Sequence, residues 1–199
     1  KINDHEGLCT LGIIFQEGIY TDMNMNEAIK YHSLAAEQNN LLSLFNLYIL
    51  YDSYDENKAI EYLKKGADLG DKFFQYLFAY DLYYYKINVD VNECIKYLKL
   101  SAAQNFVNSN HLLGVIYYLN PKMKNIEKAI KYFSIASSYR RENPENNDFY
   151  DFYVTFSLPN KQIISNNLFY SEITARFSSN MCLGDIYKDK SSDYYDISK

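Results

Sequence analysis

Apolar residues recur at helical spacing along this chain, in pairs of segments that turn residues separate. Residues 109–118 are apolar on one face of a helix, and Asn120-Pro121 ends this segment because proline cannot donate its amide and disfavours helix in the preceding residue. A second segment, from about residue 126 to 138, places one apolar face at Ala129, Ile130, Phe133 and Ala136. The pattern predicts a helical hairpin.

A five-residue box marks the second helix of each hairpin. It reads Glu27-Ala28-Ile29-Lys30-Tyr31, Lys58-Ala59-Ile60-Glu61-Tyr62, Glu93-Cys94-Ile95-Lys96-Tyr97 and Lys128-Ala129-Ile130-Lys131-Tyr132. The box tyrosines are 31, 35 and 35 residues apart, a period typical of hairpins that cover one another's apolar faces. We therefore predict an all-α fold, a right-handed α-solenoid (alpha-alpha superhelix) of about five hairpins plus the first helix of a sixth.

The predicted array covers residues 5–199, after an incomplete N-terminal end at 1–4. Its units are 5–38, 39–70, 71–106, 107–140 and 147–177, with a partial sixth unit at 178–199. Residues 140–177 are open to two interpretations, an insertion or a degenerate fifth unit. We favour the unit, because Pro159 and Tyr170 repeat Pro121 and Tyr132 at an offset of 38 residues. Neither end carries a polar cap, so we expect a piece of a longer protein.

Small residues mark where helices approach each other closely. On first helices a Leu-Gly pair precedes an aromatic residue, as in Leu11-Gly12…Phe15, Leu113-Gly114…Tyr117 and Leu183-Gly184…Tyr187. In the second unit Leu44-Phe45 takes this position, with Phe45 in place of glycine. In the third unit the pair is either Tyr76-Leu77 or Leu77-Phe78. Second helices end in small pairs, Ala35-Ala36, Gly66-Ala67 and Ser101-Ala102.

Taken together, these motifs resemble the Sel-1-like repeat family of tetratricopeptide-like helical hairpins, over about residues 5–190. The resemblance implies a non-enzymatic adaptor or scaffold that binds protein partners. One alternative is a regulatory repeat arm of a larger multidomain enzyme such as a protein kinase. A less favoured alternative is a β-lactam-binding or hydrolysing repeat protein, whose regular cysteine pairing this chain lacks.

The composition and the individual reactive residues give no sign of a catalytic or nucleic-acid-binding function. A net charge of −5 argues against nucleic acid, which requires clustered lysine and arginine. No CxxC pair occurs among the three cysteines, Cys9, Cys94 and Cys182. We therefore expect reduced thiols and a cytoplasmic protein. The chain begins without Met, so this expectation leaves room for a targeting signal before residue 1. The histidines have no metal-ligand spacing and are expected on the surface: His5, His32 and His111. We predict no catalytic residue, metal, cofactor, membrane span or small-molecule substrate.

First helices usually line the concave face of a helical-hairpin array, so a partner is expected there. With the motif leucine as position zero on a helical wheel, positions −2, +2 and +5 point away from the buried stripe. The predicted partner-binding residues on these positions are Gln16, Asn46, His111, Val115, Tyr118, Asp185 and Lys188. This mixture of amide, ring and charge suits a peptide or a helix of a partner protein.

Overall fold

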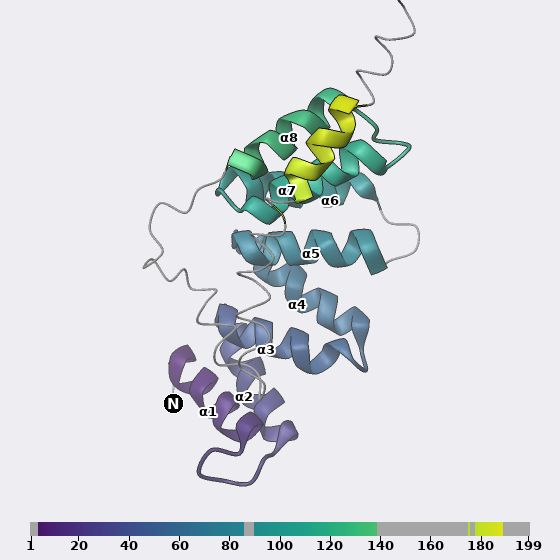
Figure 1. The fold of residues 1–199 in the computed structure, drawn as a ribbon. Coiled ribbons are helices and arrows are strands. Elements are labelled where there is room, and N and C mark those ends of the chain that lie inside the picture. Colours follow the sequence, from purple (N-terminus) through teal and green to yellow (C-terminus); the bar gives the residue numbers. More distant parts are fainter. Residues whose placement is uncertain (1–3, 86–89, 139–174, 176–177, 189–199) are drawn as a thin grey trace, which may run out of the picture.

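Four helical hairpins follow one another in the computed structural model, which describes residues 4–85, 90–138, 175 and 178–188. The helices of the hairpins are α1 His5–Glu17, α2 Met25–Glu37, α3 Leu41–Asp52, α4 Glu56–Asp68, α5 Lys72–Tyr85, α6 Val91–Ala103, α7 Val107–Leu119 and α8 Ile126–Ser138. A further helix covers residues 178–188. Consecutive helices pack against each other along the whole stack (Figure 1). The prediction of an all-α repeat solenoid is confirmed, and each box lies on the second helix of its hairpin.

Asparagine and aspartate side chains define where most of these helices begin. Asn24, Asn40 and Asp55 each accept a hydrogen bond from the backbone N–H three residues later, at 3.2, 2.8 and 3.1 Å. Such a cap satisfies a donor that has no partner inside the helix and contributes about 1 kcal/mol. α7 is preceded by Phe106, which makes no side-chain cap. Its buried ring instead packs 5.3 Å from the ring of Tyr76.

The link between one hairpin and the next has a constant length and backbone shape. Three residues join α2 to α3, α4 to α5 and α6 to α7. The middle residue is Asn39, Gly70 or Asn105, with a positive φ of 63°, 92° or 62°, a left-handed conformation that asparagine and glycine tolerate best. Each lies eight residues after a box tyrosine. The connections inside the hairpins vary from three to seven residues and the first helices from 12 to 14, so the repeat period changes between the start of the first helix and the start of the second.

Counting from this link corrects the predicted register of two first helices. Nine residues after the positive-φ residue, α7 has Gly114, and the same count gives Tyr48 in α3 and Ala79 in α5. The prediction that Phe45 replaces the glycine of the second unit is therefore wrong. Neither register that was considered for the third unit is correct, because the pair is Phe78-Ala79.

Ring contacts support the corrected register. Three residues after the glycine position, an aromatic ring stacks on the box tyrosine of the same hairpin. The centroid distances are 5.5 Å for Phe15–Tyr31, 5.7 Å for Tyr51–Tyr62 and 5.7 Å for Tyr117–Tyr132. The second hairpin thus uses Tyr51, three residues after Tyr48, as the first and fourth hairpins use the residue three after their glycine.

The type of residue that follows the box tyrosine differs between hairpins with and without glycine at the Leu-Gly position of the first helix. A Cβ added to Gly12 would lie 2.6 Å from the ring of His32, and one added to Gly114 would lie 2.5 Å from the ring of Phe133. Both rings are fully buried. In the other two hairpins the equivalent residues are Leu63 and Leu98. Leucine has no flat ring, and the equivalent first-helix positions of these hairpins carry a side chain, Tyr48 and Ala79.

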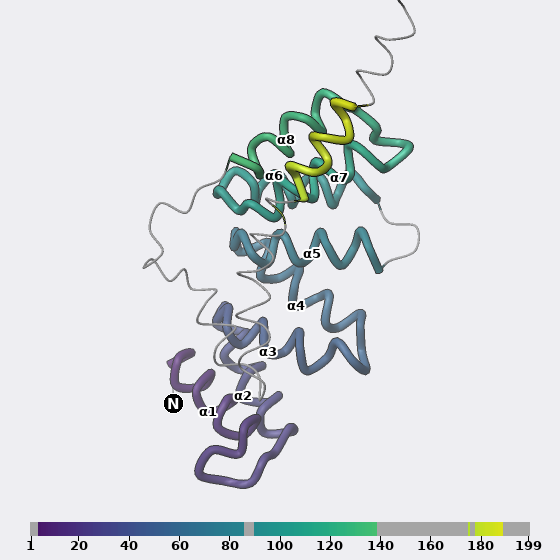
Figure 2. The backbone as a smooth tube through the Cα atoms, in the orientation of Figure 1, coloured from purple at the N-terminus to yellow at the C-terminus, as the bar shows by residue number. Residues whose placement is uncertain are grey.

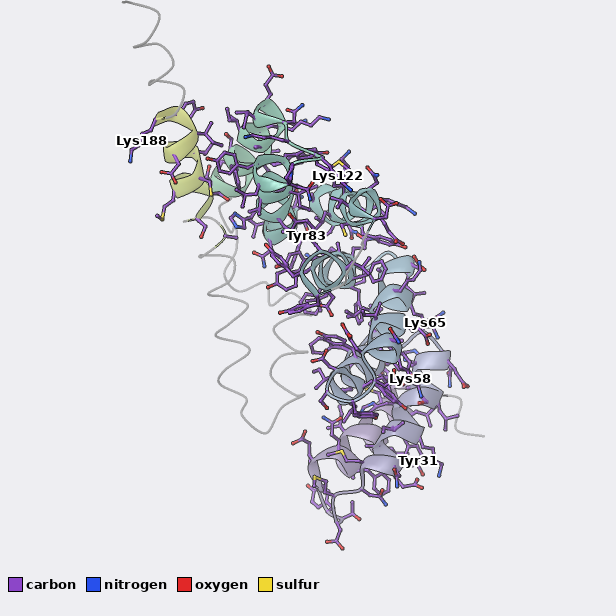
Figure 3. All side chains as sticks on the ribbon, turned by 90° about the vertical axis from the view of Figure 1, so that its right-hand side faces the viewer. Tyr31, Lys58, Lys65, Tyr83, Lys122 and Lys188 are labelled. Atoms are coloured by element: carbon purple, nitrogen blue, oxygen red, sulfur yellow. The ribbon has the colours of Figure 1, made fainter. Side chains whose placement is uncertain are left out.

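The stack curves with its first helices on the inner side. α1 also contacts α3, and α5 contacts α7, whereas no two second helices among α1–α8 make contacts of this extent. At these two steps the first helices are closer to one another than the second helices are, and we take the side of the first helices as the inner, concave side. In Figure 3, Tyr83 of α5 lies on this side, and Tyr31, Lys58 and Lys65 of the second helices lie on the opposite, outer side.

Helix 178–188 packs directly on the fourth hairpin (Figures 1 and 2). The Nδ1 atom of His111 in α7 is 2.9 Å from the Oγ atom of Ser179, and Ile186 belongs to the common core. This helix lies next to α7 and α8, and its assignment as the first helix of a sixth unit stays a prediction. The predicted fifth unit falls on residues 147–177, which lie outside the described part of the chain except for Ala175.

Candidate partner-binding surface

Two of the predicted partner-binding residues lie in the core. The exposed fraction is 0% for Asn46 in α3 and 9% for Gln16 in α1, so the prediction that they point away from the buried stripe is wrong. For Asn46 the cause is the register, because the wheel was centred on Leu44 rather than on Leu47. Three residues make about 300° of rotation, so this error displaces the predicted face by about 60° toward the buried stripe. Gln16 is buried because its amide contacts His32 from the facing helix.

His32 joins the first two hairpins and is not a surface residue, contrary to the prediction. Its Nε2 atom lies 3.3 Å from Oε1 of Gln16 in α1, and its Nδ1 atom lies 3.3 Å from Oγ of Ser43 in α3. Burial lowers the pKa of His32 from 6.5 to about 4, so the ring is neutral at neutral pH. The sequence held one signal for this burial, the glycine at position 12 on which the ring packs. The role of His32 is structural.

The remaining predicted residues lie on α7 and on helix 178–188. His111, Val115 and Tyr118 are half-buried, and burial lowers the pKa of His111. The bond of His111 to Ser179 gives this histidine a place in the stack. Asp185 and Lys188 are exposed, and Lys188 lies at the far end of the array in Figure 3. Contact of these five residues with a partner stays a prediction.

Tyrosines gather on the inner side of α3 and α5, where the sequence analysis named none. We define the inner tyrosine surface as Tyr48, Tyr76, Tyr80, Tyr83, Tyr84 and Tyr85. The ring centroids are 4.7 Å apart for Tyr80–Tyr84, 5.0 Å for Tyr83–Tyr84 and 5.7 Å for Tyr76–Tyr80. Tyr84 and Tyr85 are 50% and 65% exposed. In the corrected register, wheel positions −2, +2 and +5 of α5 are Tyr76, Tyr80 and Tyr83, so the wheel rule finds three of these six tyrosines.

Two carboxylates lie among these rings. Burial, followed by the negative charges of Asp81 and Asp52, raises the pKa of Tyr48, which also shares a side-chain hydrogen bond with Asp81. Asp81 is largely buried, whereas Asp52, the last residue of α3, is exposed. The inner tyrosine surface is therefore acidic as well as aromatic.

The second helices carry eight lysines and seven carboxylates, so the outer side of the array is nearly neutral, and its lysines lie over aromatic rings. The Nζ atom of Lys58 donates to the hydroxyl of Tyr51 at 2.8 Å and lies 4.1 Å from the centre of the same ring. Lys64 donates to the hydroxyl of Tyr97 at 3.1 Å. These lysines cover aromatic rings of their own array, as long cationic side chains commonly do. The outer rings are thus already in contact with cations.

The described residues contain little that suits catalysis. Cys94 is fully buried, and burial raises the pKa of its thiol to about 11, so the reactive thiolate is disfavoured. Burial likewise raises the pKa of Cys9. Within this part of the chain, no group of three His, Cys, Asp or Glu residues is arranged to hold a metal ion. A search of the same residues for a membrane span finds no helix of sufficient length and apolarity.

Comparisons with known proteins agree with the repeat architecture. The family model described as Sel1 repeat matches residues 5–40, 50–71, 76–106 and 107–138, more than half of the chain. Members of this family are typically non-enzymatic protein–protein interaction repeats. The comparison with curated proteins gives no match.

Two solved structures are similar to this chain. One is c5321, a protective antigen of uropathogenic Escherichia coli strains that displays an SLR fold, with a TM-score of 0.53 and 26% identity over 66% of this chain. The other is a Sel1 repeat protein from Oxalobacter formigenes, with a TM-score of 0.58 and 18% identity over 67% of this chain; at this identity the likeness concerns the fold alone. The matches cover 30% and 58% of the lengths of those two proteins.

Proposed function

Because this chain belongs to the Sel1 repeat family, whose members generally mediate interactions between proteins, we propose that it is a non-enzymatic scaffold or adaptor. In this proposal its concave face binds a peptide segment of a partner protein. The observation that carries the proposal is the inner tyrosine surface, which places exposed and half-buried rings side by side on the concave side of α3 and α5. Tyrosine supplies a large contact area and a hydroxyl at a low cost in side-chain entropy, which makes it common in binding sites.

The test uses random peptides displayed on phage and selected on the purified full chain. Affinities of the selected peptides are then compared between the parent, a Tyr84→Ser/Tyr85→Ser double variant and a Tyr20→Ser control. Tyr20 is fully exposed in the connection between α1 and α2, so it matches the chemistry of the change at another place. We expect a loss of about tenfold or more in the inner variant, as for exposed aromatic hot spots, and none in the control.

Two outcomes would overturn the proposal: selection yields no binding peptide, or the inner variant binds the selected peptides as tightly as the parent. Circular dichroism of each variant shows whether the helices are intact. The predicted cytoplasmic location stays a prediction, as do the alternatives of a kinase-fused arm and of a β-lactam-active protein.

A further inference from the structure

Positive charge is divided unequally between the two sides of the array. Among α1–α8, the first helices contain one lysine, Lys72 at the first residue of α5. The second helices contain eight lysines: Lys30, Lys58, Lys64, Lys65, Lys96, Lys99, Lys128 and Lys131. The first helices nevertheless carry acidic residues at Glu6, Glu17, Asp52 and Asp81. The inner side therefore presents carboxylates with almost no lysine to neutralise them.

The acidic charge is concentrated where the inner tyrosine surface lies. Asp52 ends α3, and Tyr85 ends α5. Asp52, Asp81 and Tyr85 all act electrostatically on the hydroxyl of Tyr48, which places these groups close together. The helix dipoles of α3 and α5 place partial negative charge at their C-terminal ends. A cation that approaches these rings is thus attracted by two carboxylates and by two helix ends.

The rings themselves suit a planar cation. A guanidinium group stacks on the face of a tyrosine, and it donates two parallel hydrogen bonds to a carboxylate. On the outer side, this chain shows the same preference with its own lysines, as in the contact of Lys58 with Tyr51. The cation–π contacts of this chain's own lysines include those on Tyr51, Tyr97 and Tyr117.

We infer that the inner tyrosine surface recognises an arginine-bearing, cationic segment of a partner protein. This inference rests on the proposed function and names the chemical class of the segment. Arginine side chains stack on the exposed faces of Tyr84 and Tyr85, and Asp52 pairs with a guanidinium at the edge. Asp81, which is largely buried beneath the rings, attracts the cation at longer range.

The experiment uses three displayed peptide libraries that are identical except at fixed positions, which hold arginine, lysine or glutamine. Each library is selected on the full chain. Selected arginine peptides are then resynthesised with citrulline, which keeps the shape of arginine and removes its charge. We expect enrichment in the order arginine, lysine, glutamine, and a loss of about tenfold or more with citrulline, because stacking and ion pairing both need the cation.

Variants of the chain locate the contact. Asp52→Asn removes one exposed charge from the inner side and is expected to weaken arginine peptides about fivefold, with a smaller effect at high salt. Glu61→Gln removes an exposed charge from α4 on the outer side and is expected to change nothing. Both substitutions preserve side-chain size, so the fold is retained.

The outcomes separate the two proposals. If citrulline peptides bind as tightly as arginine peptides while Tyr84→Ser/Tyr85→Ser still abolishes binding, the inference is wrong and the concave face remains a peptide site. If Asp52→Asn and Glu61→Gln weaken binding equally, the attraction is unspecific and the inference is also wrong. If the tyrosine variant leaves arginine peptides bound at full affinity, both the inference and the proposed function fail.

Discussion

The first and fourth hairpins place a ring of the second helix against a glycine of the first, whereas the second and third hairpins have leucine in place of the ring. Gly12 faces His32 and Gly114 faces Phe133, while the equivalent first-helix positions of the other two hairpins hold Tyr48 and Ala79. In the first and fourth hairpins the volume of the ring leaves no room for a Cβ on the facing glycine. Glycine thus occurs on the first helix where the second helix brings a ring against it.

The largest loss of stability is expected when a methyl group is added to the glycine that packs against a buried ring. Gly114→Ala places a Cβ 2.5 Å from the ring of Phe133, and because Phe133 is fully buried the ring cannot move aside freely. We expect the free energy of unfolding to fall by about 3 kcal/mol, at the upper end of typical overpacking effects. Urea unfolding followed by circular dichroism measures this change.

Two further variants sharpen this result. Gly184→Ala is the matched control, because a Cβ on Gly184 meets nothing within 4 Å, and it should be neutral or slightly stabilising. The double variant Gly114→Ala/Phe133→Leu reproduces the Ala79 and Leu98 combination of the third hairpin. It is expected to recover part of the loss, and a double variant that is less stable than Gly114→Ala would contradict the volume argument.

The second largest effect is a pH dependence of stability, which the buried His32 gives to the first hairpin and which Phe133 cannot give to the fourth. The pKa of His32 is about 4 in the folded chain against 6.5 when it is unperturbed, so between these values the unfolded chain binds more protons. Stability therefore falls as the pH falls. From pH 7 to pH 5 this residue alone should reduce the free energy of unfolding by about 2 kcal/mol.

The His32→Leu variant, which copies the second and third hairpins, isolates this contribution. Its unfolding free energy is measured in urea at pH 7 and pH 5 beside that of the parent. The variant should lose about 2 kcal/mol less than the parent over this interval, while His111 and all carboxylates are common to both chains. Equal losses in the two chains would show that the protonation of His32 does not oppose folding.

The smallest effect concerns the polar residue at the core of the second hairpin. Asn46 is fully buried, and within the described residues neither of its amide atoms has a hydrogen-bond partner. The equivalent residues in the third and fourth hairpins are Leu77 and Leu112. Because a buried polar group without a partner is unfavourable, Asn46→Leu should raise the free energy of unfolding by about 1 kcal/mol. A lower midpoint in urea would show that the amide has a structural role.

Sequence alone predicted the second helices better than the first. α4 carries polar residues on one side and Ala59, Leu63 and Ala67 on the other, so its hydrophobic pattern has a definite phase. α3 is apolar on nearly every side, and the pattern therefore could not distinguish Leu44-Phe45 from Leu47-Tyr48. The available signal was the constant eight residues from each box tyrosine to asparagine or glycine.

Prediction of the candidate site depended on the phase of the hydrophobic pattern in the first helices. In α5, five tyrosines occur among fourteen residues, and only the correct register assigns Tyr76, Tyr80 and Tyr83 to the inner face. The burial of His32 was missed for another reason. A polar residue beside a box tyrosine is expected at the surface, and only the contact with Gly12 and Gln16 across the hairpin explains its place in the core.

Because the link between hairpins is constant, one hairpin of this chain can be duplicated as a unit. Residues 71–105 run from just after one positive-φ residue to the next, so a second copy of this stretch joins to the first through the same backbone shape. A chain built in this way has one more hairpin and a longer concave face. Its one new junction packs α6 against a second copy of α5 in place of α7, so the link sets the geometry of the junction and the facing side chains decide its stability.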